Sequence, residues 1–272
     1  FNAAMQNGGR MIGPTIAGIL LTMSSEAFCF LANGISKLAV IASLIMMVVV
    51  PYVRSAAKTR IWTSFKEGVT YAWDLVPARL LLPLVALASF MLTPYLTLMP
   101  IFAAEVFCGG ARTLGFLISG AGFGGIVGMI YLASRRDVRG LARWIVFAAA
   151  LAGVAIIGFA YSRWLPLSLP LIAVTGFGII VMANSTSQIL QTIVDDNKRG
   201  RVMSFFVMAF LGMQPVGSLA AGALASWIGA SHTLALGGLC TIFGACLLWR
   251  KLPLLRLHIR PIYTRLGIIP EQ

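Results

Sequence analysis

The feature that most constrains the fold is a series of long stretches without a charged residue. A helix rises about 1.5 Å per residue, so roughly 20 apolar residues are needed to cross the hydrocarbon core of a bilayer, which is about 30 Å thick. Four uncharged stretches are long enough for one crossing each: 80–104, 113–134, 144–162 and 164–194. A fifth stretch, 202–249, holds 48 residues. It predicts two crossings joined by a hairpin at Gly229-Ala-Ser-His232.

Two further apolar stretches precede these six predicted spans. They cover residues 2–24 and 27–50, and they contain Arg10 and Lys37 respectively. Inside lipid a helix satisfies all of its own backbone hydrogen bonds, so apolar stretches of this length are expected to be helical. The sequence therefore predicts an all-α, polytopic membrane helix bundle with eight transmembrane helices.

The basic residues lie in short clusters between the apolar stretches. The formal charge is +13, yet only 11% of the residues are charged and 59% are hydrophobic. Of the 21 lysines and arginines, 17 fall in segments 51–79, 135–143, 198–201 and 250–265, which are alternate connections of the predicted bundle. Basic residues gather in this way on the cytoplasmic side of membrane proteins. We therefore interpret the charge as a sign of topology, and we expect no nucleic acid as a partner.

A repeat relates the first two predicted spans to the last two. Shifting the chain by 204 positions aligns glycines, the residues that let helices approach closely in membranes. The aligned pairs are Gly8 with Gly212, Gly13 with Gly217, Gly18 with Gly222 and Gly34 with Gly238. Four predicted spans lie between the copies, so the repeat indicates a six-helix unit, and we expect four further helices before Phe1. Two parallel six-helix halves are typical of transporters with a substrate cavity between the halves.

The most specific motif is the segment Gly9-Arg10-Met-Ile-Gly13-Pro14-Thr-Ile-Ala-Gly18. It resembles the antiporter motif, G-x-x-x-G-P-x-x-G-G, of major facilitator superfamily exporters, and it departs from that motif only at Ala17. Small residues every fourth position allow close helix contact, and a proline inside the span bends it. The resemblance implies the major facilitator fold and export. A general packing seam is the alternative interpretation.

Two more segments extend the resemblance. The stretch from Gly128 to Gly140 is similar to the loop signature of the superfamily, with Ser134 in place of its aspartate. The resemblance implies a cytoplasmic gating loop, in which Asp137 would pair with Arg135 or Arg139, next to Arg136. Because Ser134 replaces the aspartate of the gating salt bridge, a loop that only anchors the helices is the alternative interpretation. The Arg199-Gly-Arg201-Val sequence, followed by Gly212, Pro215, Gly217 and Gly222, resembles the enterobactin-exporter-like, or transmembrane secretion effector, branch.

Polar residues inside the predicted spans are the candidate transport residues. Charges in a span cost roughly 2.5–3.5 kcal/mol each on insertion scales, so Lys37 and Arg10 are expected to bind an anionic group or a carboxylate, or else to snorkel. Asn184, Gln188 and Gln191 recur at i, i+4 and i+7 and predict a polar helix face. Such a face is expected to line a cavity or to hydrogen-bond a neighbouring helix.

The resemblance implies a secondary active transporter of the bacterial inner membrane that exports a siderophore-like or drug-like small molecule with protons as the coupling ion. No cofactor is expected, since the four cysteines stand singly and only two histidines occur. We find no constellation of an enzyme. The alternative is a receptor or scaffold that retains the fold without transport.

The same reasoning divides the chain into four parts. Residues 1–50 are expected to form the last two helices of the N-terminal six-helix half, and residues 51–77 a central cytoplasmic loop. Residues 78–251 are expected to form the C-terminal half, and residues 252–272 a cytoplasmic tail.

Overall fold

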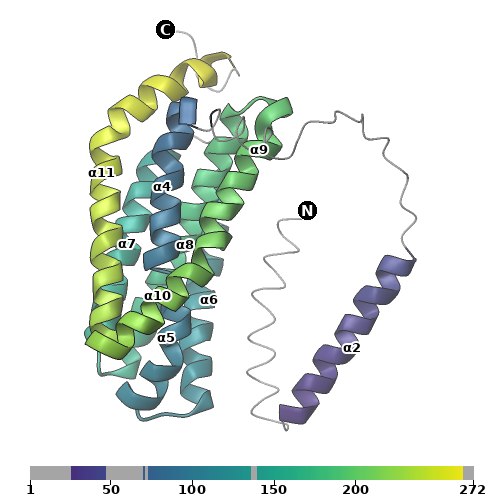
Figure 1. Ribbon diagram of the computed structural model, residues 1–272, viewed down its shortest axis with the longest axis vertical. Coiled ribbons are helices and arrows are strands. Elements are labelled where there is room, and N and C mark those ends of the chain that lie inside the picture. Colours follow the sequence, from purple (N-terminus) through teal and green to yellow (C-terminus); the bar gives the residue numbers. More distant parts are fainter. Residues whose placement is uncertain (1–25, 47–69, 71–72, 136–139, 266–272) are drawn as a thin grey trace. The chain divides into compact units, whose positions relative to one another are not determined.

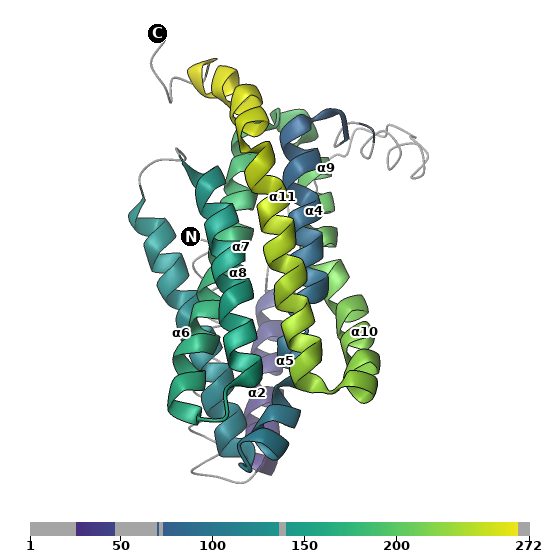
Figure 2. The ribbon, with the colours of Figure 1, turned by 90° about the vertical axis from the view of Figure 1, so that its left-hand side faces the viewer.

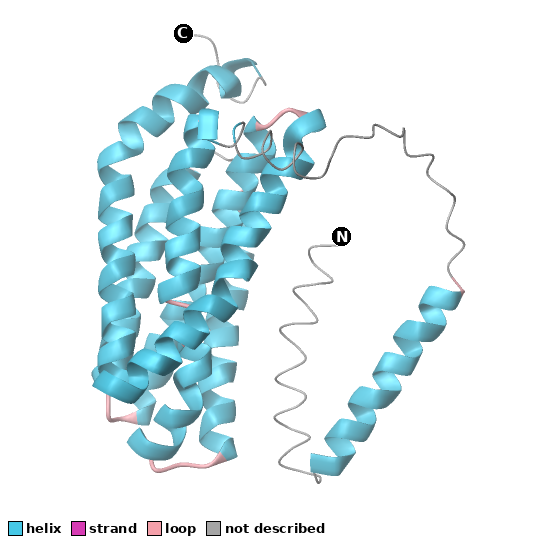
Figure 3. Ribbon diagram, in the orientation of Figure 1, coloured by secondary structure: helices cyan, strands magenta, loops and turns pink. Residues whose placement is uncertain are grey.

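The computed structural model describes residues 26–46, 70, 73–135 and 140–265. Every regular element in these residues is a helix (Figures 1 and 3). The chain divides into two compact units, Phe1–Ser64 and Phe65–Gln272. In the first unit the described element is α2 (Glu26–Ile45). In the second unit the elements are α4 (Val76–Met91), α5 (Tyr95–Ile101), η1 (Phe102–Val106), α6 (Ala111–Ser134), α7 (Leu141–Tyr161), α8 (Leu165–Ile193), α9 (Asp196–Val207), η2 (Met208–Gly212), α10 (Met213–Ile228) and α11 (Ala230–Arg265).

Six helices of the described chain are long and apolar enough to cross a membrane. They are Val76–Val106, Ala111–Ser134, Leu141–Tyr161, Leu165–Ile193, Lys198–Ile228 and Ala230–Thr264. They correspond to the six spans predicted from the uncharged stretches. A hairpin lies at the predicted place, residues 229–232, but it is tighter than predicted: α10 ends at Ile228, Gly229 has a φ of +86°, and α11 begins at Ala230.

The count of eight spans stays a prediction. The first predicted span, at 2–24, lies outside the described residues, and the second overlaps the 20-residue helix α2. The division into four parts stays a prediction as well. One boundary can be described more fully: α11 continues through residue 251 to Arg265, so most of the expected tail is helical.

The helices of the larger unit pack in a connected order. α8 lies between α6 and α7, α7 also contacts α11, and α11 contacts α4, which in turn contacts α10 (Figures 1 and 2). Only residues 162–164 join α7 to α8, and only Gly229 joins α10 to α11. Connections this short make consecutive spans antiparallel, so the basic clusters around Arg135, Arg143 and Arg250 meet at one end, called here the basic end.

Glycines set the closest approaches between these helices. A methyl group on Gly124 of α6 would overlap the carbonyl of Ala173 in α8, and one on Gly176 would overlap the carbonyl of Ala121. Gly120, Gly124 and Gly128, spaced four residues apart on α6, thus form a packing surface against α8. In the same way a methyl group on Gly153 of α7 would lie 2.8 Å from the carbonyl oxygen of Gly238 in α11.

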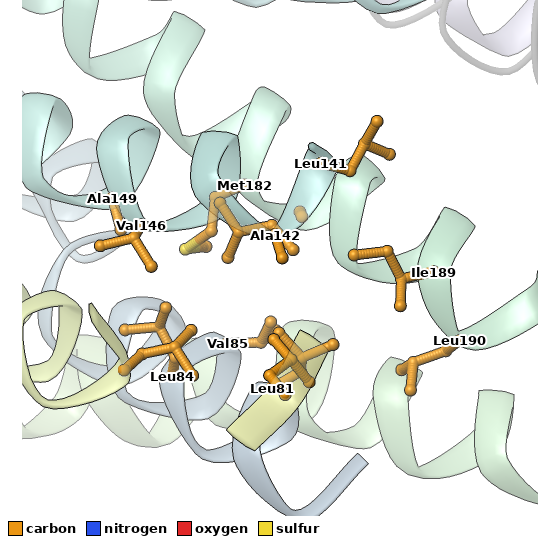
Figure 4. Close-up of a cluster of buried hydrophobic side chains, with 14 of the residues drawn as sticks. Leu81, Leu84, Val85, Leu141, Ala142, Val146, Ala149, Met182, Ile189 and Leu190 are labelled. Carbon is orange, nitrogen blue, oxygen red and sulfur yellow. The ribbon is translucent and has the colours of Figure 1, made fainter. Parts of the chain in front are cut away.

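Apolar side chains fill the interior in two clusters, one toward each end of the bundle. Figure 4 shows part of the cluster near the basic end, where Leu81 and Val85 of α4 lie opposite Ala142 and Val146 of α7 and Met182 of α8. The second cluster includes Phe102 and Phe159, whose ring centroids are 5.0 Å apart. Lipid tails are as apolar as leucine, so the gain from these clusters is close van der Waals contact more than exclusion of water.

Candidate functional site

The polar segment of α8 lies inside a membrane-spanning helix. Asn184 is half-buried, and its amide donates to the carbonyl of Ile180 at 2.9 Å. Gln188 and Gln191 are exposed, and the Gln191 amide donates to the hydroxyl of Ser187 at 2.7 Å. Both bonds run one turn back along α8. Asn184 is 19 residues beyond Leu165, the first residue of α8, about 28 Å along the helix, so the polar segment lies toward the basic end of the span.

Hydroxyl groups occupy the other side of the same helical turn. Ser185 and Thr186 are fully buried, and the Thr186 hydroxyl donates to the Met182 carbonyl at 2.9 Å. The Oγ atoms of Ser185 and of Ser89 in α4 are buried and have no hydrogen-bond partner within the described part of the chain. An unsatisfied buried hydroxyl typically costs about 1–3 kcal/mol. The two helices that carry them contact each other, so α8 and α4 hold spare hydrogen-bonding capacity in the interior.

A side-chain hydrogen bond links α5 to α10. The Thr97 hydroxyl donates to the Ser218 hydroxyl at 2.9 Å, and the pair is exposed. The preceding residue, Gly217, makes this possible. A methyl group there would overlap the backbone carbonyl of Phe90, so only glycine lets α10 come this close to α4.

Aromatic rings hold Arg135 at the end of α6. Its guanidinium carbon lies 5.8 Å from the ring centre of Tyr131 and 5.6 Å from that of Trp144, at the start of α7. Its Nη1 donates to the Tyr131 hydroxyl at 3.2 Å. The chain returns to α7 through Gly140, whose φ of +77° favours glycine. Arg135 is therefore fixed by cation–π contacts of the kind that contribute about 0.5–1 kcal/mol at exposed sites.

The remaining predicted residues of the loop, Arg136, Asp137 and Arg139, lie outside the described residues. Sequence reasoning missed Tyr131 and Trp144. The spacing of four residues between Tyr131 and Arg135 is a local signal that could have indicated the first contact. The contact with Trp144 depends on how α6 meets α7.

The motif residues Gly9, Arg10, Gly13, Pro14 and Gly18 also lie outside the described residues. Lys37 lies near the middle of α2 and is exposed in that unit. The described structure thus does not gather the predicted residues into one cluster. It places Asn184, Gln188 and Gln191 on one helix and Arg135 at the end of another, and the roles of all of them stay predictions.

Three acidic side chains of the larger unit lie on its surface. Asp74, Glu105 and Asp195 are all exposed. Among the described residues, no three His, Cys, Asp or Glu side chains are close enough to hold a metal ion. The chemistry that the described site can offer is therefore hydrogen bonding from amides and hydroxyls, with a basic rim at one end.

Comparisons with known proteins agree with this architecture. A family model described as transmembrane secretion effector matches residues 1–259. A curated protein named Staphyloferrin A transporter, from Staphylococcus aureus (strain NCTC 8325 / PS 47), is 26% identical over 245 residues. The match covers 89% of this chain and 60% of that protein, so the chain spans about three fifths of the length of its relative.

Proposed function

Because the chain belongs to the transmembrane secretion effector family of the major facilitator superfamily, we propose that it forms part of a secondary active transporter for a small molecule. The cycle is conformational: two halves alternate access to a site near the middle of the membrane, and no covalent bond is made or broken. The transporter resides in a bacterial inner membrane and crosses it many times.

The observation that carries the proposal is the exposed polar side of α8. Gln188 and Gln191 are exposed and Asn184 is half-buried, all three in the part of this membrane-spanning helix toward the basic end. Polar side chains in spans face a bundle interior or a water-filled cavity, because lipid cannot hydrogen-bond them. The helix that presents them also carries the buried hydroxyl of Ser185, which has no hydrogen-bond partner among the residues that the structure describes. A cavity wall that binds an oxygen-rich solute fits this arrangement.

We propose a siderophore-like or drug-like substrate, moved outward and coupled to protons. The substrate class is supported by the relative, whose name refers to staphyloferrin A. The outward direction is supported by the likeness of residues 9–18 to the antiporter motif of exporters. Coupling to protons is supported by the same family resemblance.

Transport by the full-length protein tests the proposal. In proteoliposomes with an imposed proton gradient, we expect protein-dependent movement of staphyloferrin A, or of ethidium as a drug-like probe. Movement should fall when the gradient is collapsed. Asn184→Leu and Gln188→Leu should each lower the rate by about ten-fold, the equivalent of one lost hydrogen bond of roughly 1.4 kcal/mol. Lys37→Ala and Arg10→Ala should lower it as well.

The matched control is Ser226→Ala, which removes an exposed hydroxyl that bonds to Ala223 within α10 at 2.7 Å. This variant should transport like the wild type. Equal rates in wild-type and protein-free vesicles would refute transport. Binding of a probe without movement would instead favour the receptor or scaffold, and movement that ignores the gradient would refute proton coupling.

A further inference from the structure

The last part of α11 extends beyond the length that a bilayer crossing needs. The helix has 36 residues, about 54 Å, against a hydrocarbon core of about 30 Å. Aromatic side chains mark the two headgroup levels, where tryptophan and tyrosine gather. In α7, Trp144 and Tyr161 are 17 residues apart, about 26 Å along the axis. In α11, Trp249 is 19 residues beyond Ala230, about 28 Å. Trp249 therefore marks the headgroup level of the basic end, and residues 250–264 follow within that region.

The helix bends where it reaches this level. Pro253 has no N–H for the carbonyl of Trp249, and its ring clashes with that carbonyl, which bends a helix. Figures 1 and 2 both show the C-terminal end of α11 turning away from the line of its lower part. Leu252, Leu255 and Ile259 are buried in the same cluster as Leu81 of α4. One side of the segment is thus fixed against the bundle.

The opposite side combines apolar and basic residues. Leu254 and Leu257 are 41% and 70% exposed, and Pro261 follows at the same helical spacing. Exposed cations flank this apolar strip, Lys251 on one side and Arg256 and Arg260 on the other. Arg250 lies in line with the strip, one turn before Leu254. No aspartate or glutamate occurs between Asp196 and Glu271 in the sequence. The segment therefore presents an apolar strip bordered by positive charge.

We propose that residues 250–264 of α11 form a binding surface for anionic phospholipid headgroups. Leu254 and Leu257 insert at the boundary between headgroups and acyl chains, and Lys251 and Arg256 contact the phosphates on either side. An amphipathic helix with this pairing of apolar and cationic residues binds in the plane of the interface, and its affinity depends on lipid charge. We choose lipid over a soluble partner because Trp249 places this segment at the level of the headgroups, where lipid lies beside Leu257.

Quenching of Trp249 fluorescence by brominated lipid tests this surface directly. The full-length protein is placed in phosphatidylcholine nanodiscs that contain a fixed fraction of either brominated phosphatidylglycerol or brominated phosphatidylcholine. The signal of Trp249, which is 57% exposed, is the difference between the wild type and Trp249→Phe. We expect brominated phosphatidylglycerol to quench more strongly, and rising salt to reduce the difference. Lys251→Gln with Arg256→Gln should lower the preference roughly five-fold per charge removed.

Matched variants separate charge at this surface from charge elsewhere. Arg112→Gln with Arg163→Gln removes two exposed cations from the opposite end and should leave the preference unchanged. Lys251→Arg with Arg256→Lys keeps both charges and should retain it. Equal quenching by the two brominated lipids in the wild type, a preference that ignores salt, or a preference that survives loss of both cations would overturn the proposal. Because quenching does not depend on transport, this proposal can be refuted or supported independently of the proposed function.

Discussion

The larger unit contains two regions that differ in how its helices meet. In α6, α7 and α8, glycines face the backbone of the neighbouring helix, as Gly124 faces Ala173 and Gly176 faces Ala121. In α10, all of whose residues are described, Gly217 alone is buried. Of the most apolar part of Leu141–Tyr161, 56% is buried, against 17% for Lys198–Ile228.

The difference shows which helices can move as one body. Lipid tails do not drive apolar side chains together, so the stability of each contact depends on how closely the backbones approach. The α6–α8 contact has such approaches on both helices. α10 has one, at Gly217, beside the hydrogen bond from Thr97 to Ser218. We therefore expect α6, α7 and α8 to be a rigid block, and α10 to be attached to α4 near one position.

The largest expected effect comes from filling the α6–α8 contact. Gly124→Leu places a side chain where the Ala173 carbonyl lies, and it should cost about 3 kcal/mol or more of unfolding free energy. Titration with SDS, followed by circular dichroism, measures this loss. Gly222→Leu on α10 is the matched control, because a methyl group there would meet no side chain or neighbouring helix of the described residues within 4 Å. A similar loss for both variants would remove the distinction between the regions.

A smaller effect is expected at the α10 attachment. Gly217→Leu should separate α10 from the Phe90 backbone at a cost of about 1–3 kcal/mol, while the α6–α8 contact persists. Cysteine crosslinking measures this: a pair introduced at Thr97 and Ser218 should lose yield in the Gly217→Leu background. A pair at Gly120 and Ile172 should keep its yield. Loss of both crosslinks would show that the packing of α6 against α8 depends on the position of α10.

The smallest effect is expected for the hydrogen bond between Thr97 and Ser218. A double-mutant cycle with Thr97→Val and Ser218→Ala should give a coupling of about 0.6 kcal/mol, the average for hydrogen bonds between helices in membranes. SDS unfolding of the four proteins supplies the cycle. A coupling energy near zero would show that the hydrogen bond does not stabilise the contact, and that the close approach at Gly217 alone attaches α10 to α4.

Much of the fold of the larger unit can be predicted from the positions of the stretches without charged residues. The ends of α6, α7 and α8 lie close to the charges that bound their apolar stretches, such as Arg112 and Arg163. The length of α11 could not be predicted from the uncharged stretches, because prolines such as Pro253 and Pro261 usually end helices. Here the burial of Leu252 and Leu255 keeps the segment helical. The π-turn η2 has no signal in its residues, since apolar side chains are equally suited to an α-helix.

The part of the candidate site that depends on one helix was predictable from residue spacing. The spacing of Asn184, Gln188 and Gln191 identified a polar side of α8 from one helix alone. The burial of the Ser89 and Ser185 hydroxyls depends on the packing of α4 against α8, which are distant in sequence. The contact of Arg135 with Trp144 depends on how α6 meets α7 across the connection between them. Which helices contact each other cannot be predicted from the residue spacing of a single sequence.

The π-turn η2 also bears on how this span tolerates changes in length. A π-turn is an α-helix with one extra residue, since its hydrogen bonds reach five residues instead of four. In this span η2 accommodates the extra residue between the regular helices α9 and α10. Deleting one residue between Met208 and Gly212 would restore a regular helix and leave both flanking faces in register. A deletion in the uninterrupted helix α8 would rotate everything beyond it by about 100°. Relatives that differ in length by one residue can therefore share this contact surface if the gap falls at η2.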